Sequence, residues 1–330
     1  MSSYRGRFPC GYAPGLVLSV RKSPEGGGVR TQVVQCPQRT ERVDDLVLLV
    51  HGFNNHVCEA AERYKAFRDR QYPLAGMQPP QLERTLGDFY WPGDAEWGKA
   101  DLFDFAAYPQ MLQQALDSAK SLAKYLRERR EFQKIHFVGH SLGCRVVLEC
   151  IREMLPTCAG RIGHVILMAP AVPTAMVERG AELAAAVERA ESVLVLSSFS
   201  DGVLCFSFPA GETLVGQREG ILPQALGRDG PPSNKPGNLT GEPIDSASHG
   251  DYWGFKPICE AASQKVADLV AQTLWPGCAR PEPPCREVGA GRECGSPRSE
   301  SAPSRGILSS RANGYCQAER NLADCLAFPS

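Results

Sequence analysis

The chain has 330 residues, 43% of them hydrophobic, and its 36 Lys and Arg residues balance 37 Asp and Glu residues. This is sufficient for one large domain or two small ones, and the balanced charge without a basic stripe disfavours a nucleic-acid partner. The sequence has no run of about 18 apolar residues, so it predicts no transmembrane segment. The first residues lack a signal-peptide core, so we expect a cytoplasmic location.

Thirteen cysteines are present, and their spacing along the chain is irregular. No pair has the spacing of a zinc site. We therefore expect most of them to be buried, reduced thiols that pack as small hydrophobic residues, and we expect no metal site.

Strands and helices are predicted to alternate along most of the chain. The segments "GLVLSV" and "TQVVQC" flank the turn-forming "RKSPEGGG" and predict a hairpin near the N-terminus. Apolar runs predict strands at 44–52, 88–91, 135–139, 164–172 and 192–200. Apolar residues at helical spacing predict helices at 57–70, 112–126, 142–154, about 175–190 and about 259–274.

This alternation predicts an α/β fold with a mostly parallel central sheet and helices on both faces. Residues 1–43 are expected to contribute N-terminal strands to the same domain, and residues 44–275 to form its core. No regular element is assigned to the Gly- and Pro-rich stretch at about 208–248. Residues 276–330 are rich in Pro, Gly, Ser and Cys and lack periodicity, which predicts a disordered tail.

Ser141 lies between two glycines in "HFVGHSLGCRVV", after a predicted strand and before a predicted helix. This context is typical of a nucleophile elbow, a sharp strand-to-helix turn that exposes a serine hydroxyl. Side chains at Gly139 and Gly143 would collide with the neighbouring strand and helix. The N–H groups at the start of the helix favour an oxyanion there, and that of Leu142 is the expected donor. The alternative is a Gly-Ser turn without chemistry.

A nucleophilic serine needs a base and an acid that orients the base, and this architecture orders them Ser, acid, His. Of six histidines, only His164 and His249 follow Ser141. His164 begins a strand, at the edge opposite to the carboxyl ends where active sites gather, so His249 is the predicted base. Asp201 ends the apolar run "SVLVLSSFSD" and is the predicted acid, although it could also be a turn residue.

A second oxyanion donor is expected in "HGFNNH", the loop after the strand at 44–52. Gly52 would let the backbone approach the site closely, and the N–H of Phe53 would point at it. Asn54 or Asn55 could hold the loop by side-chain hydrogen bonds. A simple strand-ending turn is the alternative.

These motifs resemble the α/β-hydrolase superfamily. The segments "LVLLVHGFNNHVCEAAERY", "FYWPGD", "VGHSLGCRVVLE", "VILMAPAV", "SSFSDGVL" and "SHGDYW" are similar to a mostly bacterial family of α/β-hydrolases of unknown function. The likeness spans about 44–275, which is then an α/β-hydrolase catalytic core. It implies Ser141 as nucleophile, Asp201 as acid and His249 as base, with Phe53 and Leu142 as oxyanion donors.

The main hypothesis is a serine hydrolase that cleaves a small-molecule or lipid-like carboxylic ester or thioester through an acyl-enzyme, without metal or organic cofactor. The "GHSLG" form also occurs in lipases, but no compact cap domain is predicted between the strands at 164–172 and 192–200. Tyr252 and Trp253 could line the substrate pocket or simply belong to the core. A silent binding module with the same fold and an acyltransferase with the same triad are the alternatives.

Overall fold

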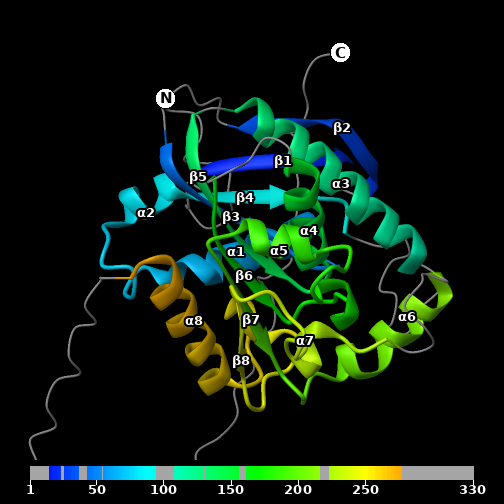
Figure 1. Ribbon diagram of the computed structural model, residues 1–330. Helices are drawn as coiled ribbons and strands as arrows, with labels where there is room; N and C mark the ends of the chain where they lie inside the picture. The colour runs from blue at the N-terminus through cyan, green and yellow to red at the C-terminus, as the bar shows by residue number, and fades with distance from the viewer. Residues whose placement is uncertain are drawn as a thin grey trace, which may run out of the picture.

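The computed structural model describes residues 15–23, 26–36, 43–53, 55–93, 108–129, 131–155, 161–215 and 223–276. In this part of the chain eight strands form one sheet, in the order β2-β1-β4-β3-β5-β6-β7-β8 (Figure 1). Neighbouring strands run parallel except β1 and β2, which form an antiparallel hairpin. The strands are β1 Leu16–Ser23, β2 Gly26–Cys36, β3 Val43–Val50, β4 Leu86–Tyr90, β5 Phe132–His140, β6 Ile162–Met168, β7 Ser192–Ser197 and β8 Leu239–Pro243.

The helices lie on the two faces of this sheet. The chain moves one way from β3 to β4 and the other way from β4 through β8, so right-handed crossovers place α1 on one face and α3 and α4 on the other. Helix α8 packs on α1, while α3 packs on α4 and α6. The helices are α1 Val57–Gln71, α2 Pro79–Thr85, α3 Tyr108–Glu128, α4 Leu142–Met154, η2 Thr174–Val177, α5 Ala184–Arg189, η3 Val203–Ser207, α6 Phe208–Val215, α7 Leu226–Asp229, η4 Asp251–Trp253 and α8 Glu260–Leu274.

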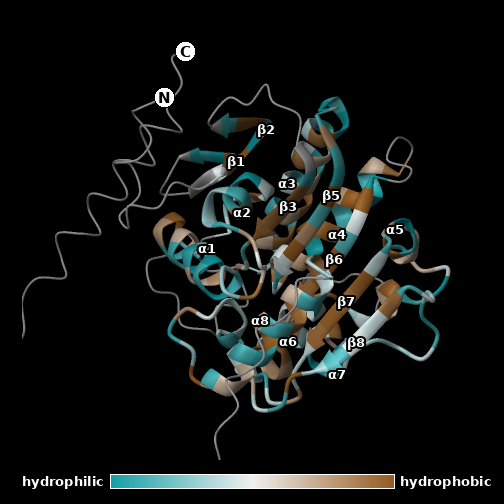
Figure 2. Ribbon diagram, turned by 90° about the vertical axis from the view of Figure 1, so that its left-hand side faces the viewer, coloured by the Kyte–Doolittle hydropathy of each residue, from teal (hydrophilic) through white to brown (hydrophobic). Residues whose placement is uncertain are grey.

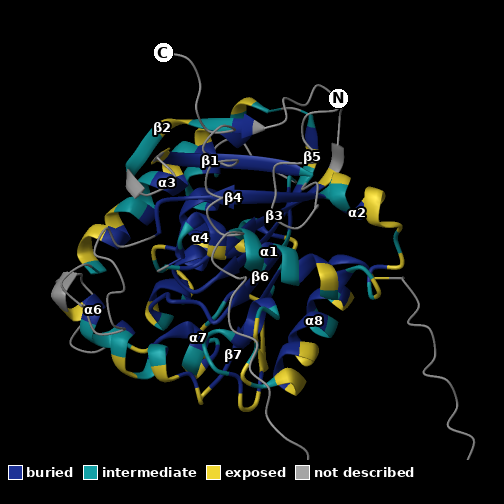
Figure 3. Ribbon diagram, turned by 180° about the vertical axis from the view of Figure 1, so that it is seen from behind, coloured by how far each residue is buried: buried dark blue, intermediate teal, exposed yellow. Residues whose placement is uncertain are grey.

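The central strands are apolar on both faces, which suits a parallel sheet covered by helices on each side. Leu46, Leu48 and Leu49 in β3 are completely buried, and all five residues of β4 are buried. Figure 2 shows the central strands as largely hydrophobic, and Figure 3 shows the sheet as the most deeply buried layer. This layer fixes the strand ends from which the loops of the candidate site emerge.

The α/β fold, the mostly parallel sheet and the N-terminal hairpin are as the sequence predicts. The helix predicted at 142–154 coincides with α4, and that at 57–70 differs from α1 by one residue. Apolar residues at helical spacing made these elements predictable.

Two regions differ from the prediction. The helix expected at about 175–190 is two short helices, η2 and α5, separated by Gly180 with a φ of 81°. A left-handed φ cannot continue a right-handed helix. The sequence predicts no regular element in the stretch at about 208–248, but the structure has α6, α7 and β8 there. Strand β8 is exposed except at Leu239 and forms by pairing with β7, so its residues carry no apolar signal.

Among the described residues, no helix combines the length and apolar character needed to cross a bilayer. Cys58, Cys144 and Cys150 are buried free thiols, as expected, whereas Cys205 and Cys259 are free thiols that are partly exposed. The predicted tail lies outside the described residues from position 277 onward.

A buried ion pair joins α1 to β4. Arg68 Nη2 is 2.6 Å from Asp88 Oδ1, and both side chains are almost completely buried. Burial raises the pKa of the Asp88 carboxyl, although the Arg68 guanidinium beside it acts in the opposite direction. The carboxylate therefore depends on Arg68 to remain ionised inside the protein.

We predict that Arg68→Met lowers the free energy of unfolding at neutral pH by about 3–5 kcal/mol, because it leaves a buried charge unpaired. The loss shrinks as the pH falls, since the folded-state pKa of Asp88 lies above the unfolded value of about 3.9 and protonation removes the charge. Urea unfolding at about pH 5 and about pH 8 measures both effects. Lys134→Met, which breaks the exposed pair with Glu191, should cost about 1 kcal/mol or less. Equal losses from both variants would contradict the prediction.

Candidate active site

Ser141 lies in a strained turn between β5 and α4. Its backbone has a φ of 53° and a ψ of −126°, a left-handed conformation that residues with side chains rarely adopt. Two hydrogen bonds to the end of β6 and the loop after it hold the turn: the Ser141 N–H donates to the Met168 carbonyl at 2.9 Å, and the Ala171 N–H donates to the Ser141 carbonyl at 3.1 Å. The strain is therefore maintained by the neighbouring strand.

The two glycines beside Ser141 are required by close backbone contacts. A Cβ atom on Gly143 would lie 2.3 Å from the His51 carbonyl oxygen, so α4 could not approach the end of β3. A Cβ atom on Gly139 would lie 3.1 Å from Cys144 Cα, which is tighter than an ordinary contact. The predicted collision is confirmed at Gly143, whereas a side chain at Gly139 would make a tight contact with α4.

The three residues predicted to cooperate lie together at the carboxyl edge of the sheet. His249 Nε2 is 2.9 Å from Ser141 Oγ, and His249 Nδ1 is 2.7 Å from Asp201 Oδ2. The Asp201 carboxylate accepts the proton of Nδ1, which leaves the lone pair of Nε2 facing the Ser141 hydroxyl. Asp201 is completely buried, whereas the His249 side chain is 19% exposed and can be reached from solvent.

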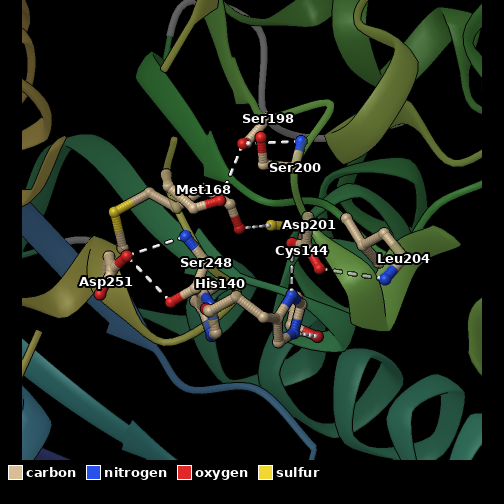
Figure 4. A network of polar contacts seen from close by, with 12 residues as sticks. His140, Cys144, Met168, Ser198, Ser200, Asp201, Leu204, Ser248 and Asp251 are labelled. Carbon is tan, nitrogen blue, oxygen red and sulfur yellow. Dashed lines mark hydrogen bonds and ion pairs between the residues drawn. The ribbon is translucent and has the colours of Figure 1, made fainter. Parts of the chain in front are cut away.

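Asp201 is held by its own turn after β7. Its second oxygen, Oδ1, accepts a hydrogen bond from the Leu204 N–H at 3.1 Å (Figure 4). The Ser198 hydroxyl donates to the Ala247 carbonyl at 2.8 Å, which links this turn to the loop that carries His249. The acid and the histidine are therefore fixed relative to one another by backbone contacts as well as by their side chains.

The loop around His249 is organised by Asp251, which is completely buried. Its Oδ2 accepts hydrogen bonds from the N–H and the hydroxyl of Ser248 at 2.8 and 2.9 Å, as Figure 4 shows. Its Oδ1 accepts from the N–H groups of Ile258 and Cys259 at 2.5 and 3.3 Å. One carboxylate thus accepts hydrogen bonds from donors before and after η4. Hydrogen bonds to an ionised group are stronger than those between neutral groups.

The loop after β3 lies against Ser141. A Cβ atom on Gly52 would lie 3.0 Å from Ser141 Cβ, which is tighter than an ordinary contact. The Asn55 side-chain amide donates to the carbonyls of Gly52 and Phe53 at 3.1 and 2.9 Å, which confirms the expected role of an asparagine in holding the loop. Asn54 lies outside the described residues. Leu142 is the first residue of α4, where N–H groups have no acceptor within the helix.

His51, at the start of this loop, is fixed by aromatic residues. Its ring stacks on Trp91 with the centroids 5.6 Å apart, and Trp91 Nε1 donates to the His51 carbonyl at 2.8 Å. The His51 N–H donates to the Tyr64 hydroxyl at 2.8 Å. These contacts determine how Gly52 and Phe53 enter the site.

Tyr252 and Trp253, the candidates for substrate contact, are core residues in this structure. They are 2% and 1% exposed, and the Trp253 ring packs edge-on against Tyr64 and Phe67 at 5.4 and 5.6 Å. Neither side chain presents a surface to a substrate in this conformation. Among the described residues no group of three or more His, Cys, Asp or Glu side chains is arranged to hold a metal ion.

Two residues of the site carried no signal in the sequence. Asp251 and His140 act through contacts with the backbone of the His249 loop. Nothing in "SHGDYW" or "VGHSLG" distinguishes them from surface or core residues, since the groups they contact are distant in sequence or belong to an irregular loop.

We predict that Gly143→Ala lowers the amount of folded protein sharply, because the new Cβ meets the His51 and Val50 carbonyl oxygens at 2.3 and 2.7 Å. Gly237→Ala is the matched control, since a Cβ there meets nothing within 4 Å. Circular dichroism with heating compares the two unfolding midpoints. A Gly143→Ala midpoint equal to that of Gly237→Ala would contradict the close approach of α4 to β3.

Several solved structures align with parts of the chain. An esterase from Pyrobaculum calidifontis is 16% identical, with a TM-score of 0.38, over 72% of this chain and 78% of that chain. An uncharacterized protein from Bacillus cereus ATCC 10987 is 13% identical, with a TM-score of 0.42, over 72% and 61%. Est1E from Butyrivibrio proteoclasticus is 14% identical, with a TM-score of 0.37, over 72% and 91%. These superpositions are loose, and no statement about function rests on them.

Comparison of the sequence with curated proteins found no match. Residues 30–217 match the family described as alpha/beta hydrolase of unknown function (DUF900). The match includes β3, the loop after it, the Ser141 turn and Asp201. The chain therefore belongs to this family of α/β-hydrolases.

Proposed function

We propose that the protein is a serine hydrolase that cleaves a carboxylic ester or thioester, with Ser141 as nucleophile, His249 as base and Asp201 as the acid that orients the base. The observation that carries this proposal is the unbroken pair of hydrogen bonds from Asp201 Oδ2 through His249 to Ser141 Oγ, at 2.7 and 2.9 Å. This arrangement of a buried carboxylate, an accessible imidazole and a strained serine is what nucleophilic catalysis by a hydroxyl needs.

The reaction begins when Ser141 Oγ attacks the acyl carbon and His249 Nε2 takes the hydroxyl proton. Asp201 stabilises the resulting imidazolium through the hydrogen bond to Nδ1, and because Asp201 is completely buried, solvent weakens this attraction little. His249 then gives the proton to the leaving alcohol or thiol. Water, activated by the same histidine, attacks the acyl-enzyme and releases the acid.

The oxyanion of the tetrahedral intermediates is proposed to lie between the N–H groups of Phe53 and Leu142. Support comes from the position of Leu142 at the start of α4, a helix of 13 residues whose positive dipole end favours an anion. The Asn55 side-chain amide donates to the Gly52 carbonyl, which belongs to the same peptide group as the Phe53 N–H. Loss of one such donor typically costs about 3–4 kcal/mol of transition-state stabilisation.

The substrate is proposed to be a small-molecule or lipid-like ester. We do not assign substrate contacts to Tyr252 or Trp253, because both side chains are buried in the core, where Trp253 packs against Tyr64. Phe53 is only partly buried and packs at the edge of the core, so its ring is available beside the proposed oxyanion donors.

We predict that a fluorophosphonate probe adds once to the folded protein and not to Ser141→Ala, because only an activated serine attacks phosphorus. His249→Ala removes the base and should abolish labelling, and Asp201→Asn should slow it by about 10⁴-fold by favouring the wrong tautomer. Intact-mass spectrometry measures the adduct. Ser192→Ala, at the opposite edge of the sheet, is the control and should label at the wild-type rate. A folded wild-type protein without an adduct would instead favour a binding role.

We also predict that hydrolysis of a chromogenic ester falls as the pH is lowered, because a protonated base cannot accept the proton of Ser141. The rate should be restored when the pH is raised again. A pH profile of kcat/KM measures this fall, and the unfolding midpoint at each pH separates it from loss of structure. A rate that stays flat into the acidic range while the protein remains folded would argue against His249 as the base.

A further inference from the structure

His140 connects the strand that carries Ser141 to the loop that carries His249. It is the last residue of β5, directly before Ser141, and only 4% of its surface is exposed. Its Nε2 atom lies 2.8 Å from the backbone carbonyl oxygen of His249. Because a carbonyl can only accept a hydrogen bond, Nε2 carries the proton and donates it.

The same ring also contacts the two other parts of the site. The imidazoles of His140 and His249 lie with centroids 4.9 Å apart. On its other side, His140 Nδ1 would lie 3.0 Å from a Cβ atom on Gly52, in the loop after β3. One buried ring therefore lies between the nucleophile turn, the base and the loop that carries Phe53.

The charge state of His140 suits this position. Burial lowers its pKa well below the ordinary value for histidine, and the nearby His249 and Arg63 act in the same direction. His140 therefore stays neutral with the proton on Nε2. A second imidazolium beside His249 would oppose the charge that His249 gains when it takes the serine proton.

We propose that His140 is a positioning residue that sets the distance between His249 and Ser141 through its hydrogen bond to the His249 carbonyl. The inference rests on the proposed function, since it assigns His140 a role for that base. It also differs from the role of Asp251, which holds the same loop through Ser248 and not through the histidine itself. The hydrogen bond from His140 fixes the position of His249 relative to β5, the strand that leads into Ser141.

The geometry separates substitutions that keep the bond from those that lose it. His140→Gln has a side-chain N–H that can reach the His249 carbonyl. His140→Asn is also polar, but its shorter amide cannot reach, and His140→Leu has no donor. His136→Leu is a matched control, because His136 is a buried histidine on the same strand whose partner is the His164 N–H at the opposite edge.

The experiment measures the saturation kinetics of fluorophosphonate labelling for these variants. It gives the maximal labelling rate constant, kinact, and the probe concentration at half of that rate, KI, separately. Circular dichroism gives the unfolding midpoint of each variant. We expect kinact to fall about tenfold or more in His140→Leu and His140→Asn, since small misplacement of a reacting group costs up to about 10²-fold. KI should change by less than about twofold, and His140→Gln should return kinact to within about threefold of wild type. His136→Leu should label at the wild-type rate.

The outcomes are distinguishable. Labelling of wild type with unchanged kinact in the Leu or Asn variant overturns the positioning role and leaves the proposed function standing. A folded Gln variant as slow as the Asn variant also overturns it, because the restored N–H would then be irrelevant. No labelling of wild type overturns the proposed function and this inference with it. If His140→Leu does not fold, the Asn and Gln pair decides.

Discussion

The backbone turn at Ser141 is the constraint on which the rest of the site depends. A non-glycine residue with a φ of 53° costs of the order of 1–3 kcal/mol, and the surrounding structure must hold it there. Met168 and Ala171 hold its two backbone groups, and the absence of a side chain at Gly143 lets α4 lie against the end of β3. These contacts come from both neighbouring strands of β5, so the turn exists only when the sheet is complete on each side of it.

The loops around this turn are connected to one another by buried polar groups. Ser198 joins the Asp201 turn to the His249 loop, Asp251 satisfies the backbone on both sides of η4, and Asn55 holds the peptide between Gly52 and Phe53. Each is a short side chain that bonds mainly to backbone atoms. Because such bonds cost little conformational entropy to form, the site is organised before any substrate arrives, as electrostatic stabilisation of a transition state requires.

The sequence predicts a strand or helix well where burial restricts which residues the element can contain. Strands such as β3 were predictable because burial on two faces gives a continuous apolar run, and helices such as α4 because their apolar residues recur at helical spacing. Strand β8 was not, because its role is to pair its backbone with β7, and four of its five residues are exposed. The break at Gly180 was hidden because the flanking apolar residues continue at helical spacing on both sides.

The same distinction applies to the site. Ser141, Asp201 and His249 could be proposed from their order and from the ends of the strands that carry them, and the structure brings them within hydrogen-bond distance. His140 and Asp251 could not, since a side chain that bonds to backbone has no partner residue type to identify it. Tyr252 and Trp253 follow His249 closely in sequence but are buried, since the Trp253 ring packs against Tyr64 and Phe67 and the Tyr252 ring lies beside His140.

The hydrogen bond from His140 to the carbonyl of His249 has a consequence for synthesis of the chain. The sheet can be assembled from the N-terminus through β7 while the ribosome is still adding residues, yet the base and its loop follow 48 residues after Asp201. Until the loop that carries His249 has left the ribosome, the His140 donor and the Asp201 carboxylate lack the partners that they have in the folded protein. The hydrogen-bonded unit of Ser141, His249 and Asp201 therefore forms only after β7 and the segment that follows it have been synthesised.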